Sequence, residues 1–329
     1  MAHEISELKA AVAGTGFIGA VHVEALRRLG VEVLGVCAST PERAAAKQLA
    51  PAYESYDALL ADARVDVVHV TTPNHLHHAQ VRAALEAGKH VVCEKPLAVT
   101  SSESGELLEL AQRSGLVHCT NFNLRFYPQA HQARALVGSR ALGDVWSVHG
   151  SYLQDWLLYP TDWNWRLEPE KGGPLRAVAD IGSHWMDLAQ WVSGRRIASV
   201  FADLETAILV RRRPAGEVET FAPAEDVERA DAPMSTEDIA HLLFRLEDGM
   251  RGAAVIAGEC WAKEHVAAGG GRLGRRRRVE LRAAGGALAR PSGPTERDVS
   301  AQPRPARSGG AGPDDAAGGA RGGVRGDIP

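Results

Sequence analysis

The sequence lacks the features that mark membrane proteins, disulfide-rich domains and structural zinc sites. No uninterrupted apolar run approaches the ~18–20 residues that span a bilayer. The chain has four cysteines, but they are widely spaced and form no Cys-x-x-Cys pair, which disfavours both a disulfide framework and a zinc site. The polar residues 1–7 do not have the form of a signal peptide. We therefore expect a cytoplasmic protein without a metal site.

A strong charge of either sign is also lacking. The formal net charge is -4 over 329 residues, of which 45% are hydrophobic, so the chain can bury a sizeable core. Residues 275–278 form a short run of arginines, but no aromatic residues interleave it and the chain as a whole is acidic. We expect neither a nucleic acid nor a membrane as a partner.

Short apolar runs alternate with longer amphipathic runs over the first 120 residues. The apolar runs predict buried strands at residues 9–13, 31–36, 67–70, 90–93 and 117–120. The amphipathic runs predict helices at residues 19–29, 41–49, 56–60, 75–87 and 102–114. Repeated strand–helix–strand units of this length indicate an α/β fold. Residues 1–121 are therefore predicted to form a Rossmann domain with a doubly wound parallel sheet.

The pattern changes at residue 122. Longer strand-like runs cover residues 145–157, 197–209, 239–246 and 250–257, and one clear helix covers residues 183–192. This pattern predicts a second domain, residues 122–258, of α+β type with an open, mostly antiparallel sheet.

Residues 259–329 form a low-complexity tail that is rich in glycine, arginine and proline and poor in branched aliphatic residues. Burial of so little apolar surface cannot offset the conformational entropy that the chain loses on folding. We therefore expect disorder and no strand of a sheet in this tail. Such a mixture is also what a GC-rich gene gives when it is read in a shifted frame. We hypothesise that the tail is frameshifted and that the second domain is incomplete.

A glycine-rich turn, Gly14-Thr15-Gly16-Phe17-Ile18-Gly19, follows the first predicted strand and opens a predicted helix. Gly14 permits the tight turn, Gly16 lets the backbone approach a pyrophosphate, and Gly19 lets the helix pack close to the strand. The helix N-terminus supplies N–H groups and a positive dipole for phosphates. This turn predicts a dinucleotide cofactor.

The end of the second predicted strand bears on the choice between NAD and NADP. An NAD enzyme usually carries Asp or Glu about 20 residues beyond the glycine-rich turn to accept from the ribose 2′-hydroxyl. This chain has Cys37-Ala38-Ser39-Thr40 there, with Arg43 one turn later. Ser39, Thr40 and Arg43 suit a 2′-phosphate, so we favour NADP over NAD. The alternative is that Thr40 only caps the helix and Arg43 is solvated.

Two loops at the carboxyl ends of later strands are expected to face the cofactor, because ligands of parallel sheets lie beyond these ends. The first carries Thr72-Pro73-Asn74-His75 and the second carries Glu94-Lys95-Pro96. The ammonium group of Lys95 suits a hydrogen bond to a substrate oxygen and stabilisation of a developing alkoxide. The alternative is that Glu94 and Lys95 are an exposed strand end.

A further motif is Asp180-x-Gly-x-His184-x-x-Asp187. If the segment is helical, the spacing places Asp180, His184 and Asp187 on one face. A carboxylate beside an imidazole raises its basicity, which suits a general base near neutral pH. The alternative is that His184 is a hydrogen-bonded structural residue.

These segments, in this order, resemble the glucose–fructose oxidoreductase/inositol dehydrogenase (Gfo/Idh/MocA) family. The resemblance covers about residues 8–257. Its specific part is Glu94-Lys95-Pro96 followed by Asp180-x-Gly-x-His184-x-x-Asp187. The intermediate stretches that also look like the family are Thr72-Pro73-Asn74-His75, Asn123-Leu124-Arg125-Phe126, and Trp165-Arg166 before Gly172-Gly173.

The resemblance implies an NAD(P)-dependent oxidoreductase that transfers hydride between a nicotinamide cofactor and a sugar, polyol or inositol-like substrate. Lys95 would polarise the reacting oxygen, His184 would exchange the hydroxyl proton, and Asp180 would orient the substrate and His184. The implied substrate contacts are Lys95, Asn123, Arg125, Tyr152, Trp163, Arg166, Asp180 and His184. The predicted cofactor contacts are Gly14, Gly16, Phe17, Ile18, Gly19, Ser39, Thr40, Arg43, Thr72, Pro73, Asn74, His77, Glu94 and Lys95.

The resemblance also implies that the open sheet of the second domain forms an oligomer interface. We therefore expect a homo-oligomer, a dimer or tetramer, if that sheet is complete. Two other functions stay open: a non-catalytic NAD(P)-binding sensor or regulator, and a redox-neutral enzyme of the same fold that cleaves glycosides.

Overall fold

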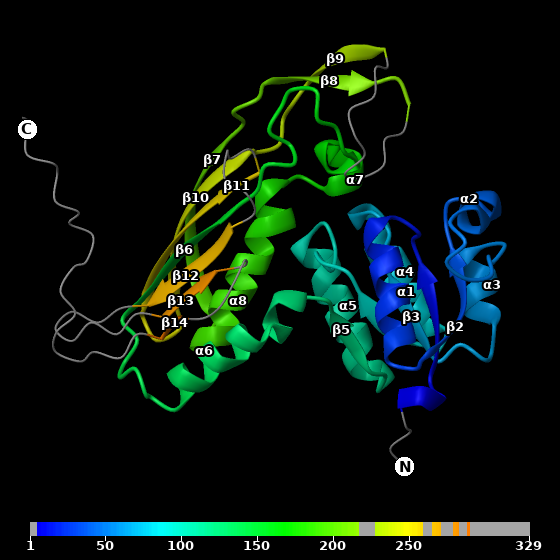
Figure 1. The fold of residues 1–329 in the computed structure, drawn as a ribbon, viewed down its shortest axis with the longest axis horizontal. Coiled ribbons are helices and arrows are strands. Elements are labelled where there is room, and N and C mark those ends of the chain that lie inside the picture. The colour runs from blue at the N-terminus through cyan, green and yellow to red at the C-terminus, as the bar shows by residue number, and fades with distance from the viewer. Residues whose placement is uncertain (1–4, 217–227, 259–264, 271–278, 283–287, 290–329) are drawn as a thin grey trace, which may run out of the picture. The chain divides into compact units, whose positions relative to one another are not determined.

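The computed structural model describes residues 5–216, 228–258, 265–270, 279–282 and 288–289 (Figure 1). After a short 3₁₀ turn at Ile5–Glu7, five strands pair in parallel in the order β2-β1-β3-β4-β5. The strands are β1 (Lys9–Ala13), β2 (Glu32–Cys37), β3 (Val67–Val70), β4 (His90–Cys93) and β5 (His118–Thr120). The helices between them are α1 (Phe17–Arg28), α2 (Pro41–Ala46), α3 (Tyr56–Ala61), α4 (Asn74–Glu86) and α5 (Ser101–Ser114). The predicted Rossmann sheet is confirmed, and its strand bounds agree with the prediction to within one residue.

Both faces of this sheet are covered, because alternate residues of its central strands point to opposite sides. On β1, Ala10 and Val12 pack with Val23 of α1. The residue between them, Ala11, packs on the other face with Leu85 of α4. The continuous apolar runs of the sequence therefore reflect burial on both faces.

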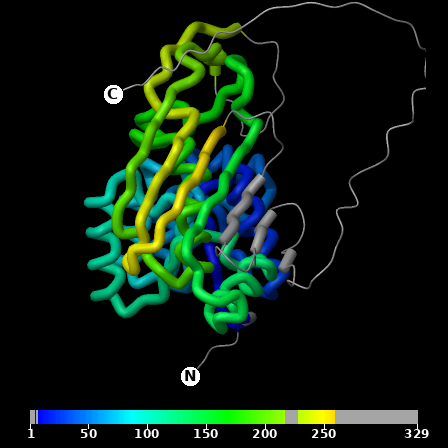
Figure 2. Tube along the Cα trace, turned by 90° about the vertical axis from the view of Figure 1, so that its left-hand side faces the viewer, coloured from blue at the N-terminus to red at the C-terminus, as the bar shows by residue number. Residues whose placement is uncertain are grey.

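The second domain is built on a seven-stranded sheet in the order β14-β13-β12-β6-β11-β10-β7. Figure 2 shows β6, β11, β10 and β7 running side by side. All neighbouring strands are antiparallel except β6 and β11, so the prediction of a mostly antiparallel sheet is confirmed. Its strands are β6 (Ser147–Leu153), β7 (Ile197–Glu205), β10 (Ile239–Leu246), β11 (Arg251–Ala257), β12 (His265–Gly270), β13 (Val279–Arg282) and β14 (Leu288–Ala289).

Two helices, α6 (Pro128–Gly138) and α8 (Ser183–Ser193), pack on this sheet. Trp185 of α8 lies against Phe244 of β10 with ring centroids 5.5 Å apart. The sequence predicted α8 but missed α6, whose buried positions are alanines that give a weak helical pattern. It also missed the hairpin of β8 (Val210–Pro214) and β9 (Arg229–Pro233) and the short helix α7 (Pro169–Gly172). Among the residues with described structure, none of the helices has the length and apolar character needed to cross a bilayer.

Strands β12, β13 and β14 correct one expectation. The sequence predicted no strand of a sheet after residue 258, yet these three segments extend the sheet beyond β6. Strand pairing uses main-chain N–H and C=O groups, which glycine and alanine supply as well as larger residues do. The composition argument therefore fails at these segments, and the other residues of 259–329 lie outside the described residues.

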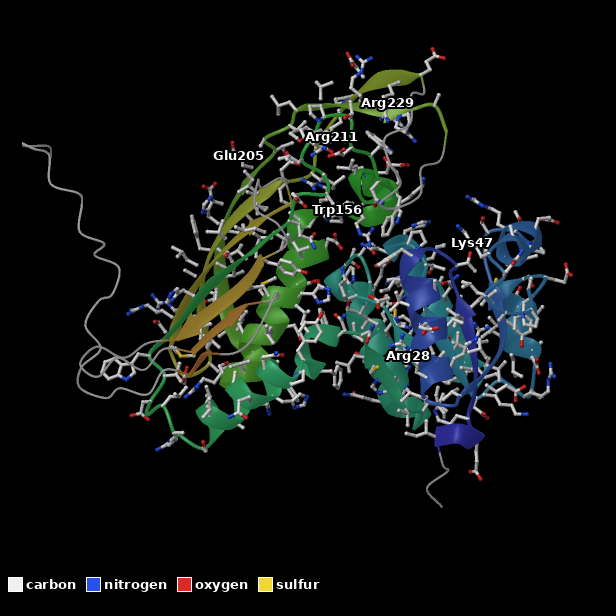
Figure 3. The ribbon with its side chains drawn as sticks, viewed as in Figure 1. Arg28, Lys47, Trp156, Glu205, Arg211 and Arg229 are labelled. Carbon is white, nitrogen blue, oxygen red and sulfur yellow. The ribbon has the colours of Figure 1, made fainter. Side chains whose placement is uncertain are left out.

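A buried cluster of charges anchors the segments that lead to the candidate site. The guanidinium groups of Arg176 and Arg211 both contact the carboxylate of Asp238, and all three side chains are at most 3% exposed. Arg211, labelled in Figure 3, also donates to the carbonyl oxygens of Leu157 and Tyr159 at 3.0 Å each. This cluster fixes both the chain after β6 and the chain before α8.

We expect Asp238→Ala to lower the free energy of unfolding by about 3–5 kcal/mol, because it leaves two buried cations without their shared anion. Asp231→Ala is the matched control, since Asp231 pairs with Arg212 on the surface, where their side chains are 68% and 50% exposed, and an exposed pair contributes little. Urea unfolding of both variants measures the difference. Equal losses in the two variants would contradict the role given to the buried cluster.

Candidate active site

The glycine-rich turn between β1 and α1 has the geometry that a bound dinucleotide requires. Gly14 has φ +104, and a Cβ on Gly19 would lie 2.1 Å from the carbonyl oxygen of Gly14, so neither position accepts a larger residue. A Cβ on Gly16 would meet no atom within 4 Å, and no side chain caps the N-terminus of α1. Phe17 and Ile18 form the first turn of this helix. The open face beside uncapped N–H groups fits a pyrophosphate.

A hydroxyl and a guanidinium lie together at the carboxyl end of β2. The Oγ of Ser39 accepts a hydrogen bond from Nη1 of Arg43 at 3.2 Å. Thr40 caps α2 by accepting from the main-chain N–H of Arg43 at 3.3 Å. The helix-cap role expected as an alternative for Thr40 is therefore present, while Arg43 contacts Ser39. Both groups suit an anion at this end of the strand.

The loop after β3 is fastened by its own polar side chains. Asn74 donates to a main-chain carbonyl of α7 at 2.9 Å. The ring of buried His77 lies between the carbonyl oxygens of Thr72 and Pro96, with nitrogen–oxygen distances of 2.8 and 2.7 Å. Asn74 and His77, both predicted cofactor contacts, therefore hold the loops around the site. Pro73 lies in the link between β3 and α4, directly before the first residue of α4.

Glu94 ends β4 inside a polar cluster. Its Oε1 accepts hydrogen bonds from His22 of α1 at 3.0 Å and from Asn121 at 2.7 Å. Burial alone would raise the pKa of this carboxyl, but the hydrogen bonds from His22 and Asn121 outweigh burial and lower it. Glu94 is therefore a buried carboxylate next to Lys95. His22 and Asn121 stand outside the motifs from which the site was predicted, so the sequence offered no sign of their contact with Glu94.

Lys95 and Asp180, which are distant in sequence, form the centre of the site. Nζ of Lys95 donates to Oδ1 of Asp180 at 2.7 Å and to its main-chain oxygen at 2.8 Å. Nε of Arg166 donates to the same Oδ1 at 3.1 Å. Burial would raise the pKa of the Asp180 carboxyl, but Arg166 and Lys95 hold it well below its usual range. The Lys95 and Asp180 side chains are only 10% and 17% exposed.

His184 lies in the first turn of α8, just after a π-helical turn at Val178–Gly182 that carries Asp180. Its buried Nδ1 has no hydrogen-bond partner among the described residues. The rings of Phe122 and Tyr152 lie beside it, with centroids 5.8 and 6.3 Å away. Burial and the charge of Lys95 lower the pKa of His184 to about 4, although Asp180 and Glu94 oppose them. The expectation that the neighbouring carboxylates would raise its basicity overall is therefore wrong, because burial outweighs them.

Asp187 corrects a second expectation. The sequence placed it beside His184, but its carboxylate accepts two hydrogen bonds from the guanidinium of Arg125, one of them at 2.7 Å. The same guanidinium lies 5.2 Å from the ring centre of Trp191. Arg125 and Asp187 therefore join the segment after β5 to α8.

Two of the other predicted substrate contacts meet the cluster of Lys95, Asp180 and His184. Arg166 contacts Asp180, and Tyr152 lies beside His184. Asn123 is exposed at the start of a 3₁₀ turn, Asn123–Phe126, and Trp163 lies against the guanidinium of Arg213 at 5.4 Å. The structure thus brings together Lys95, Asp180, His184, Tyr152 and Arg166.

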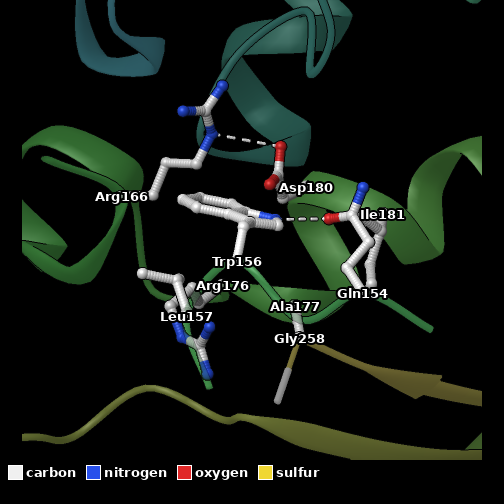
Figure 4. Close-up of a pocket in the computed structure, with 9 residues that line it drawn as sticks. All are labelled: Gln154, Trp156, Leu157, Arg166, Arg176, Ala177, Asp180, Ile181 and Gly258. Atoms are coloured by element: carbon white, nitrogen blue, oxygen red, sulfur yellow. Dashed lines mark hydrogen bonds and ion pairs between the residues drawn. The ribbon is translucent and has the colours of Figure 1, made fainter. Parts of the chain in front are cut away.

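A small pocket beside Asp180 contains residues that the sequence analysis missed (Figure 4). Gln154 and Trp156 line it, and Nε1 of Trp156 donates to Oε1 of Gln154 at 2.5 Å. The guanidinium of Arg166 lies 5.6 Å from the Trp156 ring centre. The sequence placed Gln154 and Trp156 within a predicted strand, residues 145–157. In the structure β6 ends at Leu153, and both residues belong to the loop that follows. Amide, indole and guanidinium groups are suited to binding a hydroxyl-rich molecule.

Comparison with known protein families gives matches over most of the chain. Residues 8–122 match the family described as "Oxidoreductase family, NAD-binding Rossmann fold", and residues 130–289 match the "GFO/IDH/MocA C-terminal domain". The levoglucosan dehydrogenase of Pseudarthrobacter phenanthrenivorans is 30% identical over 263 residues, which cover 76% of this chain and 67% of the relative. The D-glucoside 3-dehydrogenase of Escherichia coli is 32% identical over 200 residues, covering 57% of this chain and 55% of the relative.

Solved structures agree with these matches. An oxidoreductase domain protein from Kribbella flavida is 32% identical with a TM-score of 0.74, covering 84% of this chain and 74% of that chain. Levoglucosan dehydrogenase in complex with NADH and levoglucosan is 26% identical with a TM-score of 0.73, covering 84% of this chain and 73% of that chain. The chain spans about half to two thirds of the length of the curated relatives it matches. On its sequence, its fold and both family matches, the chain belongs to the Gfo/Idh/MocA family of oxidoreductases.

Proposed function

We propose that this protein is an NAD(P)-dependent oxidoreductase that transfers hydride between a nicotinamide cofactor and a hydroxyl-bearing carbon of a sugar, polyol or inositol-like substrate. The observation that carries the proposal is the buried cluster in which Lys95, Asp180 and His184 meet next to Glu94. Relatives named for dehydrogenation of levoglucosan and glucosides, and for reduction of 1,5-anhydro-D-fructose, support a sugar as the substrate class.

Each residue of the cluster has one role in oxidation of an alcohol. The ammonium of Lys95 donates a hydrogen bond to the reacting oxygen and stabilises its developing negative charge. His184 is neutral at pH 7 because its pKa is about 4, so it accepts the hydroxyl proton as a general base. Asp180 stays ionised and orients Lys95. A bound nicotinamide would supply the acceptor for the hydride of the substrate carbon, and in reduction of a ketone His184 would return the proton.

The surroundings of this cluster supply the contacts of a polyhydroxylated substrate. Arg166 and Tyr152 meet the catalytic residues, and Gln154 and Trp156 line the adjoining pocket. We propose these four residues as substrate contacts. Asn123, Arg125 and Trp163 remain predictions as contacts of the substrate.

For the cofactor, we propose the turn at Gly14, Gly16 and Gly19 as the pyrophosphate site and favour NADP over NAD. The contact between Ser39 and Arg43 supports the choice of NADP, because a hydroxyl and a guanidinium suit a 2′-phosphate. No acidic residue stands between Cys37 and Thr40 to accept from a 2′-hydroxyl. The remaining predicted cofactor contacts are Phe17, Ile18, Thr40, Thr72, Pro73, Asn74, His77, Glu94 and Lys95.

We also propose a homo-oligomer that forms through the outer face of the second sheet. On this face Leu243 of β10 is paired with Phe201 of β7, and their side chains are 59% and 68% exposed. Neighbouring apolar side chains of this size on an open sheet favour burial against another sheet. The cytoplasmic location and the absence of a nucleic-acid partner stay predictions.

The function is tested by mixing the protein with each of NAD and NADP and with a panel of sugars, inositols and glycosides. We expect at least one substrate to change the absorbance of the reduced nicotinamide, and Lys95→Met to lower the rate of that change strongly, because Lys95 acts on the reacting oxygen. Glycoside cleavage without a change in absorbance would identify a redox-neutral enzyme instead. Cofactor binding without turnover of any substrate would identify a sensor.

The base assignment is tested by the pH profile of oxidation. His184→Ala should reduce kcat/KM by roughly 10²–10⁴-fold, the usual share of general acid–base catalysis. A general base works only when unprotonated, so kcat/KM should fall as pH drops through the pKa of His184 in the free enzyme. Because that pKa is lowered to about 4, the wild-type protein should keep its activity at pH values where an ordinary histidine is half protonated. An acid limb at pH 6.5 or above, or one that persists in His184→Ala, would remove His184 from this role.

Cofactor choice is tested by Ala38→Asp. An Asp carboxylate at this place accepts from a ribose 2′-hydroxyl and repels a 2′-phosphate, so the ratio of kcat/KM for NAD to that for NADP should rise. Arg43→Ala should shift the ratio in the same direction by removing positive charge. A ratio unchanged in both variants would show that the ribose binds elsewhere.

A further inference from the structure

Glu94 is the end of a chain of hydrogen bonds that runs through the core of the first domain. Nε2 of His22 lies 3.0 Å from Oε1 of Glu94, and Nδ1 of His22 lies 2.8 Å from Nδ1 of His69. The His22 and Glu94 side chains are only 8% and 10% exposed. His22 comes from α1, His69 from β3 and Glu94 from the end of β4, so the chain links the cofactor-side helix to the residue before Lys95.

The carboxylate of Glu94 favours one tautomer of His22, although Nδ2 of Asn121 also lies 3.3 Å from Nε2 of His22. An ionised carboxylate only accepts hydrogen bonds, so Nε2 of His22 carries the proton that points at Glu94. The close approach of the two Nδ1 atoms requires a single proton between them. Burial and the neighbouring His22 lower the pKa of His69 to about 3, so His69 is neutral. When Nε2–H of His22 donates to Glu94, the arrangement with one proton between the two rings has Nδ1–H of His69 donating to Nδ1 of His22. His69 thereby holds His22 in its donor form toward Glu94.

The other oxygen of Glu94 acts on Lys95. Its Oε2 accepts the main-chain N–H of Lys95 at 3.2 Å, while Asn121 donates to Oε1 at 2.7 Å. The carboxylate is thus held from α1, from the chain after β5 and from Lys95 itself. A second effect reaches His184, because Glu94 is one of three charged groups that act on it, with Lys95 and Asp180. Of these three groups, Glu94 is the one with a hydrogen bond to His22.

We propose that His22, held in one tautomer by His69, is a positioning residue that fixes Glu94 as an oriented carboxylate and through it sets the direction of Lys95 and the charge felt at His184. The effect on turnover rests on the proposed function, whereas the effect on His184 does not. His22 needs no contact with substrate for this role. The role depends on two atoms of the His22 ring: Nε2, which contacts Glu94, and Nδ1, which contacts His69.

Two amide substitutions separate these atoms. The amide nitrogen of glutamine stands the same number of bonds from Cβ as Nε2 of histidine. The amide oxygen of asparagine stands the same number of bonds from Cβ as Nδ1, where it can accept from His69. His22→Gln therefore keeps a donor for Glu94, while His22→Asn loses it and keeps only the side that faces His69. We expect His22→Asn to lower kcat by roughly 10- to 100-fold through misplacement of Lys95. We expect His22→Gln to retain most of the wild-type kcat, with little change of the sugar KM in either variant.

A readout without turnover uses the protein free of cofactor. An NMR titration of the His184 imidazole in His22→Asn should show a pKa below that of the wild type, because Glu94 is protonated more readily once its donor is lost. His77, Cys93 and Cys119 also face Glu94 and are unchanged in every variant. His22→Gln should leave the titration of His184 close to that of the wild type. This measurement holds even if no sugar turns out to be a substrate, which separates failure of this inference from failure of the proposed function.

The outcomes are distinct. A lower kcat and a lower His184 pKa in His22→Asn, with both quantities close to wild type in His22→Gln, support the positioning role. Equal kcat and equal His184 titration in the two variants, whether both retained or both lost, overturns it. If neither variant folds, imidazole ¹⁵N spectra of the wild-type protein decide: protonated Nε2 and bare Nδ1 at His22 support the proposal, and the opposite tautomer overturns it.

Discussion

The ion pair between Lys95 and Asp180 is the constraint on which the site depends. It joins the end of β4 to the turn before α8 at 2.7 Å, in surroundings where each side chain is mostly buried. Removing two charges from water costs more than their attraction returns unless hydrogen bonds satisfy them. Here Asp180 also accepts from Arg166, and Lys95 also donates to the main chain of Asp180. The pair therefore holds an ammonium and a carboxylate together in a mostly buried site.

Burial and the charges around this pair together decide the protonation state of His184. Burial and Lys95 disfavour the imidazolium, while Asp180 and Glu94 favour it, and the first two effects are larger. A neutral imidazole among two carboxylates and an ammonium is a proton acceptor at pH 7. The remaining polar side chains of the site hold its loops in place. Asn74, His77 and the Arg125–Asp187 pair tie the loops of the first domain to each other and to α7 and α8.

The sequence predicted the strands of the first domain more completely than it predicted the surroundings of the candidate site. The five parallel strands are short branched-aliphatic runs buried on both faces, which leave a clear pattern. Lys95, Asp180 and His184 stand in motifs whose spacing is specific. Helix α6 buries alanines and so left little pattern, and β12 to β14 pair through main-chain groups that composition does not report. The partner of Asp187, which is Arg125, and the lowered pKa of His184 arise from tertiary contacts that helical spacing cannot show.

The most direct test of the account is a double-mutant cycle on kcat/KM with Lys95→Met, Asp180→Ala and the double variant, assayed with a substrate found in the sugar panel. If the pair acts as one unit, each single variant loses nearly as much as the double variant, because removing either partner disables the other. The free energies of activation are then far from additive. Losses that add independently would show that Lys95 and Asp180 act separately, which would contradict the central role given to their contact.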